Sequence, residues 1–187
     1  MNKLCQLAYL EVRRIGSVQQ YLSFEVITNH VSSLVFSRLD YCNALLAGSP
    51  QFSLTKFNVV NCSDRLIFKA PESSCTISLL YDLHWLPISS WIRYKIGLIA
   101  FHVVSGTALP YLSQLLHLYS PSRSLRSASD TRIFRVPKMG RGTLKERSFQ
   151  YIGLVIWNSL PSFSVRHSSS LSSFKSKLET DLFSSVY

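Results

Sequence analysis

The sequence predicts a mainly α-helical protein, an irregular helical bundle that carries one small β-hairpin. Hydrophobic residues make up 47% of the 187 positions and aromatic residues 12%, which provides enough apolar surface for a folded core. Several segments repeat apolar residues every three or four positions, the spacing of one helix face. One short segment, 132–136, instead alternates apolar and polar residues as a strand does.

The clearest helical pattern lies in the middle of the chain, within the stretch from Leu83 to Gly106. Its apolar stripe consists of Ile88, Ile92, Ile96, Ile99 and Val103. Ser89 or Ser90 can cap its start, and Gly106 suits the left-handed conformation that often follows a helix. Because this segment is apolar and nearly uncharged, we expect other helices to cover it and place it at the centre of the core.

The N-terminal part predicts two further helices. The first begins at Met1 without a capping residue, which is typical of a fragment of a longer protein, and Gly16 is expected to end it. Ser23 can cap the second helix, which Gly48 and Pro50 stop. The expected inward residues are Leu4, Leu7, Ala8, Val12 and Ile15 in the first helix, and Phe24, Ile27, Val31, Leu34, Val35, Leu39, Cys42 and Leu46 in the second.

Shorter helical patterns fill most of the remaining chain. Residues 53–68 form a weaker pattern, interrupted by the polar residues 61–64, and a short helix is expected over 76–83. Pro110 suits the first turn of a helix over 111–119. Two more helices are predicted over 149–160, ended by Pro161, and over 171–186, with inward residues Leu171, Phe174, Leu178 and Leu182.

The composition changes sharply between residues 121 and 147, here called the basic segment. Large apolar residues are scarce, and eight bases face two acids, Asp130 and Glu146. The bases are Arg123, Arg126, Arg132, Arg135, Lys138, Arg141, Lys145 and Arg147. The alternation over 132–136 and the Gly140-Arg141-Gly142 turn predict the hairpin. We therefore expect a helical region over 1–120, a basic linker or hairpin over 121–148 and a C-terminal helical segment over 149–187.

The charge distribution makes the basic segment the candidate binding element. The net charge is +10, and arginines spaced among small polar residues can reach successive phosphates of RNA or DNA. Phe134 or Tyr151 can stack on an exposed base. The alternative interpretation is a solvated linker whose charges only keep the chain soluble.

No pattern in the sequence indicates catalysis. The five aspartates form no cluster, and neither a glycine-rich phosphate loop nor a nucleophile elbow is present. The four cysteines are widely spaced, so we expect no zinc site and no other cofactor. No apolar run is long enough to span a membrane, and no signal peptide is recognisable. We expect an intracellular protein, in the nucleus or the cytoplasm, without enzymatic activity of its own.

Several motifs occur in an order that resembles a known family. The chain is similar, over nearly its whole length, to the region that follows the reverse transcriptase domain in LINE-class non-LTR retrotransposons of vertebrates. The motifs are Ser37-Arg38-Leu39-Asp40-Tyr41-Cys42-Asn43-Ala44-Leu45-Leu46, Leu83-His84-Trp85-Leu86-Pro87-Ile88, Arg93-Tyr94-Lys95-Ile96, Pro121-Ser122-Arg123-Ser124-Leu125-Arg126-Ser127, Glu146-Arg147-Ser148-Phe149, Trp157-Asn158-Ser159-Leu160-Pro161, and the segment from Ser173 to Phe183.

The resemblance implies a catalytically inactive fragment of an RNA-directed DNA polymerase. Neither the endonuclease nor the polymerase Asp-Asp motif is present, whereas thumb-like helices that grip template RNA and target DNA are implied. The missing polymerase domain of the parent protein is then a natural partner. The sequence departs from the family pattern between Lys56 and Leu66, where Ser63 and Asp64 replace alanines. Two alternatives remain: a helical protein-interaction module, and a product of a decayed element that has no function.

Overall fold

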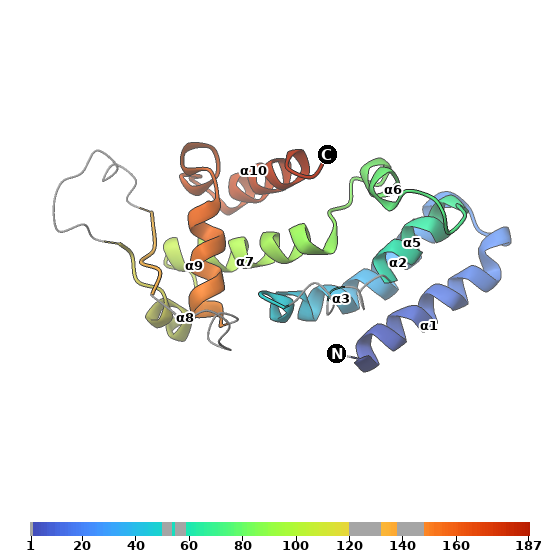
Figure 1. Ribbon diagram of the computed structural model, residues 1–187, viewed down its shortest axis with the longest axis horizontal. Coiled ribbons are helices and arrows are strands. Elements are labelled where there is room, and N and C mark those ends of the chain that lie inside the picture. The colour runs from blue at the N-terminus through green and yellow to red at the C-terminus, as the bar shows by residue number, and fades with distance from the viewer. Residues whose placement is uncertain (1, 50–53, 55–58, 120–131, 138–147) are drawn as a thin grey trace. The chain divides into compact units, whose positions relative to one another are not determined.

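The computed structural model describes residues 2–49, 54, 59–119, 132–137 and 148–187 (Figure 1). The chain is mainly helical, which confirms the predicted fold class. It divides into two compact units: residues 1–92 with Tyr187 form unit 1, and residues 93–186 form unit 2. The boundary falls inside one helix, α7 (Ile88–Val104). The domain boundary predicted near residue 120 lies beside residues outside the described part and stays a prediction.

Unit 1 begins with α1 (Asn2–Val18), which packs against α5 (Val59–Phe68). Its buried face carries Cys5, Ala8, Val12 and Ile15. Leu7, predicted to point inward, is 49% exposed, because the buried face is centred on Ala8 and Val12 and Leu7 lies to one side of it. Gly16 does not end α1. It lies within the helix, where an added Cβ atom would be 3.4 Å from Leu66 Cδ1 of α5.

The second predicted helix is present but is not uniform. Ser23 caps α2 (Phe24–Val31) by accepting a hydrogen bond from the Val26 amide at 3.4 Å, as predicted. A wider π-helical turn, Ser32–Phe36, then leads into α3 (Ser37–Cys42) and the 3₁₀ turn Asn43–Leu46. Most of the predicted apolar stripe points inward through these changes; its buried members are Ile27, Val31, Val35, Leu39 and Leu46. Phe24, predicted to point inward, is 49% exposed.

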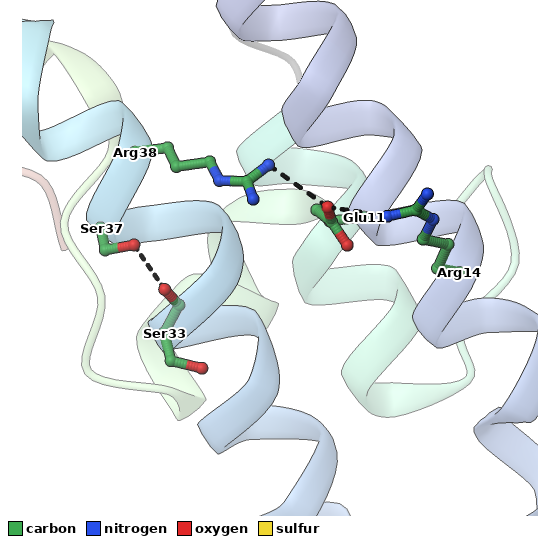
Figure 2. A network of polar contacts seen from close by, with 5 residues as sticks. All are labelled: Glu11, Arg14, Ser33, Ser37 and Arg38. Carbon is green, nitrogen blue, oxygen red and sulfur yellow. Dashed lines mark hydrogen bonds and ion pairs between the residues drawn. The ribbon is translucent and has the colours of Figure 1, made fainter.

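A buried carboxylate ties α1 to α3 (Figure 2). Glu11 is 9% exposed and accepts hydrogen bonds from Arg14 Nη1 at 3.2 Å and Arg38 Nη1 at 3.3 Å. In the same view the Ser37 hydroxyl donates to the Ser33 carbonyl of the π-helical turn. Arg38 belongs to the first family-like motif, and in the structure its guanidinium joins two helices of unit 1.

The helix α5 buries polar as well as apolar residues. Val59, Val60 and Ile67 face the core as expected of an amphipathic helix, but Ser63 and Asp64 are also fully buried. Half of the polar interruption 61–64 therefore lies inside unit 1, while Asn61 and Cys62 are half-buried. The short helix α6 (Thr76–Asp82) follows and packs against α5, close to its predicted bounds.

In its described part, unit 2 contains α7 from Arg93 onward, α8 (Pro110–Leu115), α9 (Phe149–Ser159) and α10 (Leu171–Ser184). Gly106 has φ of 69°, which confirms the predicted left-handed conformation after α7. The helix predicted over 111–119 ends at Leu115 because the chain becomes extended at Leu116. Phe174, Leu178 and Leu182 of α10 are buried, as predicted.

A row of aromatic rings forms the core of unit 2. The Phe101 and Phe174 rings stack with centroids 4.3 Å apart, Phe174 lies 5.8 Å from Trp157, and Trp157 lies 6.0 Å from Phe134. Trp157 and Phe174 have no exposed surface. The row connects α7, α10 and α9 with the extended residues 132–137, so it fixes the described part of the basic segment to the helices.

Candidate nucleic-acid interface

The described part of the basic segment, residues 132–137, is an extended stretch that pairs with residues 117–119. The Tyr119 amide donates to the Ile133 carbonyl at 2.8 Å, and the Arg135 amide donates to the His117 carbonyl at 2.9 Å. These bonds flank one isolated antiparallel bridge between Leu118 and Phe134. The predicted hairpin is therefore not seen: the described residues contain no strand, and residues 133–135 pair with residues 117–119 after α8. The predicted turn, residues 140–142, lies outside the described residues.

Two neighbouring side chains of α9 hold this stretch in place. Asn158 Oδ1 accepts a hydrogen bond from the Phe134 amide at 3.0 Å, and Asn158 Nδ2 donates to the Phe134 carbonyl at 2.8 Å. Trp157 Nε1 donates to the Arg132 carbonyl at 2.6 Å. The Asn158 amide thus replaces the backbone of a further strand, and it satisfies both polar groups of a residue that is only 2% exposed. Family-like motif residues Trp157 and Asn158 therefore have a structural role.

Phe134 cannot stack on a base, which corrects the interpretation of the sequence. Its ring is buried against Trp157, because alternation along the extended stretch directs Phe134 toward the core of unit 2. Tyr151, the other residue considered for stacking, is half-buried in the first half of α9.

Arg132 and Arg135 have different surroundings. Arg132 Nη1 donates to the carbonyl oxygens of Arg166, at 2.9 Å, and Ser168, at 3.2 Å. These acceptors belong to the end of the π-helical turn Ser162–Arg166 and the residues after it, so Arg132 supports the fold there. Its role in phosphate contact stays a prediction, and this guanidinium is already engaged with protein.

Arg135 is exposed and lines a cavity of about 550 Å³. The cavity lies within unit 2, and its lining comes from the end of α8, the extended stretch and the start of α9. Leu115, His117, Arg135, Val136, Pro137, Gln150 and Leu154 form the lining. None of these residues is acidic, and within the described ranges no ion pair of Arg135 occurs. Of the two described bases of the basic segment, Arg135 is therefore the one that is open to an external anion.

The remaining predicted bases lie outside the described residues. Lys138, Arg141, Lys145 and Arg147 follow the extended stretch, and Arg123 and Arg126 precede it. Their contact with phosphate stays a prediction. The structure thus describes two of the eight predicted residues, Arg132 and Arg135. Both lie in the same extended stretch, where Arg132 binds backbone carbonyls and Arg135 lines the cavity.

Sequence reasoning missed the residues that complete the cavity. His117 and Gln150 are 33 positions apart and meet only because residues 117–119 pair with residues 133–135 and α9 packs alongside. No local sequence pattern predicts such a pairing. One signal was present for the arginines: in an extended stretch, positions 132 and 134 share a face and position 135 takes the other, so a buried Phe134 implies an inward Arg132 and an outward Arg135.

Comparison with known proteins adds no relative: no family model, curated protein sequence or solved structure matches the chain. Across the described residues, no group of three or more histidine, cysteine, aspartate or glutamate side chains is placed to hold a metal ion. None of the helices in the described part is both long enough and apolar enough to cross a membrane.

Proposed function

We propose that this chain is a catalytically inactive remnant of a retrotransposon-encoded reverse transcriptase that binds the RNA or DNA backbone through its basic segment. The observation that carries the binding proposal is the position of Arg135, an exposed guanidinium at a cavity whose described lining residues include no acid. The concentration of eight bases against two acids in residues 121–147 supports it. The proposed origin rests on the ordered motifs along the chain, and it makes the polymerase domain of the parent protein a further partner.

A salt titration tests backbone binding. We expect the full chain to bind a labelled single-stranded RNA of about 12 nucleotides. If about five phosphates are contacted, the logarithm of the association constant falls with the logarithm of salt concentration with a slope of about −3.5 between roughly 50 and 200 mM salt. Replacing three bases of the segment, Arg135, Lys138 and Arg141, by glutamine reduces the magnitude of this slope by about 2.

The matched control replaces three exposed bases elsewhere, Arg13, Lys175 and Lys177, by glutamine. It changes the net charge equally, so a slope near that of the parent chain assigns binding to the basic segment. A salt-insensitive signal, or an equal loss in the control, contradicts the proposal. Arg132 is left unchanged in both variants because its contacts with residues 166 and 168 support the fold.

A helical protein-interaction module is the second candidate, and one observation favours it. Five large apolar residues between positions 109 and 119 are 38–59% exposed: Leu109, Tyr111, Leu115, Leu118 and Tyr119. Such a concentration is typical of a surface that a partner covers. Self-association at low protein concentration that added RNA does not change favours this candidate. A monomer that binds no nucleic acid favours a product without function.

A further inference from the structure

The cavity beside Arg135 combines apolar walls with three polar groups from separate parts of unit 2. Leu115, Val136, Pro137 and Leu154 supply the walls, while His117, Arg135 and Gln150 supply the polar groups. Its volume of about 550 Å³ lies within the roughly 300–1,000 Å³ of cavities that hold small ligands. Apolar walls with a few convergent polar groups are also typical of such sites.

The position of Arg135 is fixed through its backbone. Its amide donates to the His117 carbonyl at 2.9 Å, and the preceding residue, Phe134, is held on both sides by Asn158. The guanidinium is therefore presented from a constrained stretch, which lowers the entropic cost of holding a ligand. A guanidinium is always charged and matches two phosphate oxygens at once. Among the described residues that line the cavity none is acidic, which makes an anion the favoured ligand.

The apolar walls indicate that the ligand is larger than a phosphate. A phosphate alone gains nothing from contact with Leu154 or Val136, whereas the faces of a nucleobase are apolar. The Gln150 amide offers both donors and an acceptor, and the His117 ring offers a donor or an acceptor, so both suit the edge of a base. A base that is paired and stacked in a duplex cannot enter such a cavity.

We infer that this cavity admits one unpaired base of a single-stranded nucleic acid while the Arg135 guanidinium holds the adjoining phosphate. This inference rests on the proposed backbone binding and adds to it a preference for unpaired nucleotides. Contact with the base edge comes from Gln150 and His117, and the aliphatic walls cover its faces. The chain then binds a single strand that carries bases more tightly than a backbone of equal charge that lacks them.

The test compares two oligonucleotides of about eight residues that carry equal charge, oligothymidylate and its abasic tetrahydrofuran analogue. We expect the full chain to bind the abasic analogue about tenfold more weakly at constant salt. V136M extends an unbranched side chain into the cavity while Arg135 is still present. It should reduce the ratio of the affinities for oligothymidylate and the abasic analogue to about twofold or less. R135A should weaken binding of both oligonucleotides. K175A, on the exposed face of α10, is the matched charge control.

Each outcome separates the two proposals. Equal affinity for both oligonucleotides, with steep salt dependence, overturns the base cavity and leaves backbone binding standing. No binding of either overturns both. A tenfold ratio that V136M leaves unchanged places the base elsewhere and overturns the cavity. If V136M does not fold, Q150L replaces it. Loss of the Gln150 amide should lower the ratio of the affinities for the two oligonucleotides, and an unchanged ratio counts against the proposal.

Discussion

At the scale of single residues, Asp64 is the group whose burial most clearly lowers the stability of the folded chain. Its side chain has no exposed surface, and Oδ1 accepts a hydrogen bond from the Arg65 amide at 2.5 Å. Within the described residues, Oδ2 has no hydrogen-bond partner. Burial raises the pKa of Asp64 from 3.8 to about 6, although the Arg65 amide and charge act in the opposite direction.

This shift predicts a loss of stability as the pH rises. Below about pH 4 the carboxyl is protonated in both states and costs nothing; between about pH 4 and 6 only the unfolded chain ionises, which favours unfolding. Above about pH 6 the folded chain also ionises, and the full cost of about 3 kcal/mol is present. We therefore expect D64A to stabilise the chain relative to its parent at about pH 8 far more than at about pH 4, measured by urea unfolding.

S63A provides the matched control for D64A. Ser63 is equally buried on α5 and donates to the Val59 carbonyl at 2.7 Å, but its hydroxyl does not titrate in this range. Its effect on the free energy of unfolding should be the same at both pH values. Because each variant is compared with its parent at the same pH, the contributions of the histidines cancel. A D64A effect that is independent of pH contradicts the assignment.

At the scale of elements, the pairing of α9 with the extended residues 132–137 depends on Asn158. N158A removes both hydrogen bonds to Phe134 and leaves its buried amide and carbonyl without partners, at a cost of about 1–3 kcal/mol for each group. We expect a lower urea midpoint. Because Arg135 follows directly, we also expect weaker binding of single-stranded nucleic acid.

An exposed asparagine supplies the comparison for N158A. Asn29 lies on the solvent side of α2, and N29A should change stability by no more than about 0.5 kcal/mol. Equal effects of the two substitutions would mean that the Asn158 bonds contribute little in solution. If N158A is destabilised but still binds nucleic acid normally, binding by Arg135 does not depend on the hydrogen bonds of Asn158.

At the scale of the whole molecule, the local patterns predicted helices well and long-range pairing poorly. The helix α7 was predicted from its dense apolar stripe, and Gly106 was correctly expected past its end, but the helix begins at Ile88, ahead of the predicted cap at Ser89 or Ser90. The π-helical turn Ser32–Phe36 has no sequence signal, since its stripe remains compatible with an ordinary helix. The contact of Arg132 with residues 166 and 168 depends on α9 and the turn after it. The basic segment was identified by composition, whereas the cavity beside Arg135 required the fold.

The balance of charge acts on the molecule as a whole. Twenty lysines and arginines face ten acids, so half of the positive charges at most can be paired with a carboxylate of their own. A chain with a net charge of +10 loses stability through repulsion among like charges. Added chloride salt screens that repulsion over about 10 Å at 0.1 M. We therefore expect the urea midpoint to rise between about 0.02 and 0.2 M sodium chloride.

Replacing four exposed bases, Arg13, Lys69, Lys175 and Lys177, by glutamine reduces the net charge from +10 to +6, since each substitution removes one positive charge. This variant should show a smaller rise of the midpoint over the same range of salt. A midpoint that falls as salt is added would mean that attraction outweighs repulsion in the folded chain. The bases of residues 121–147 would then be neutralised within the protein, and fewer of them would be available for phosphate.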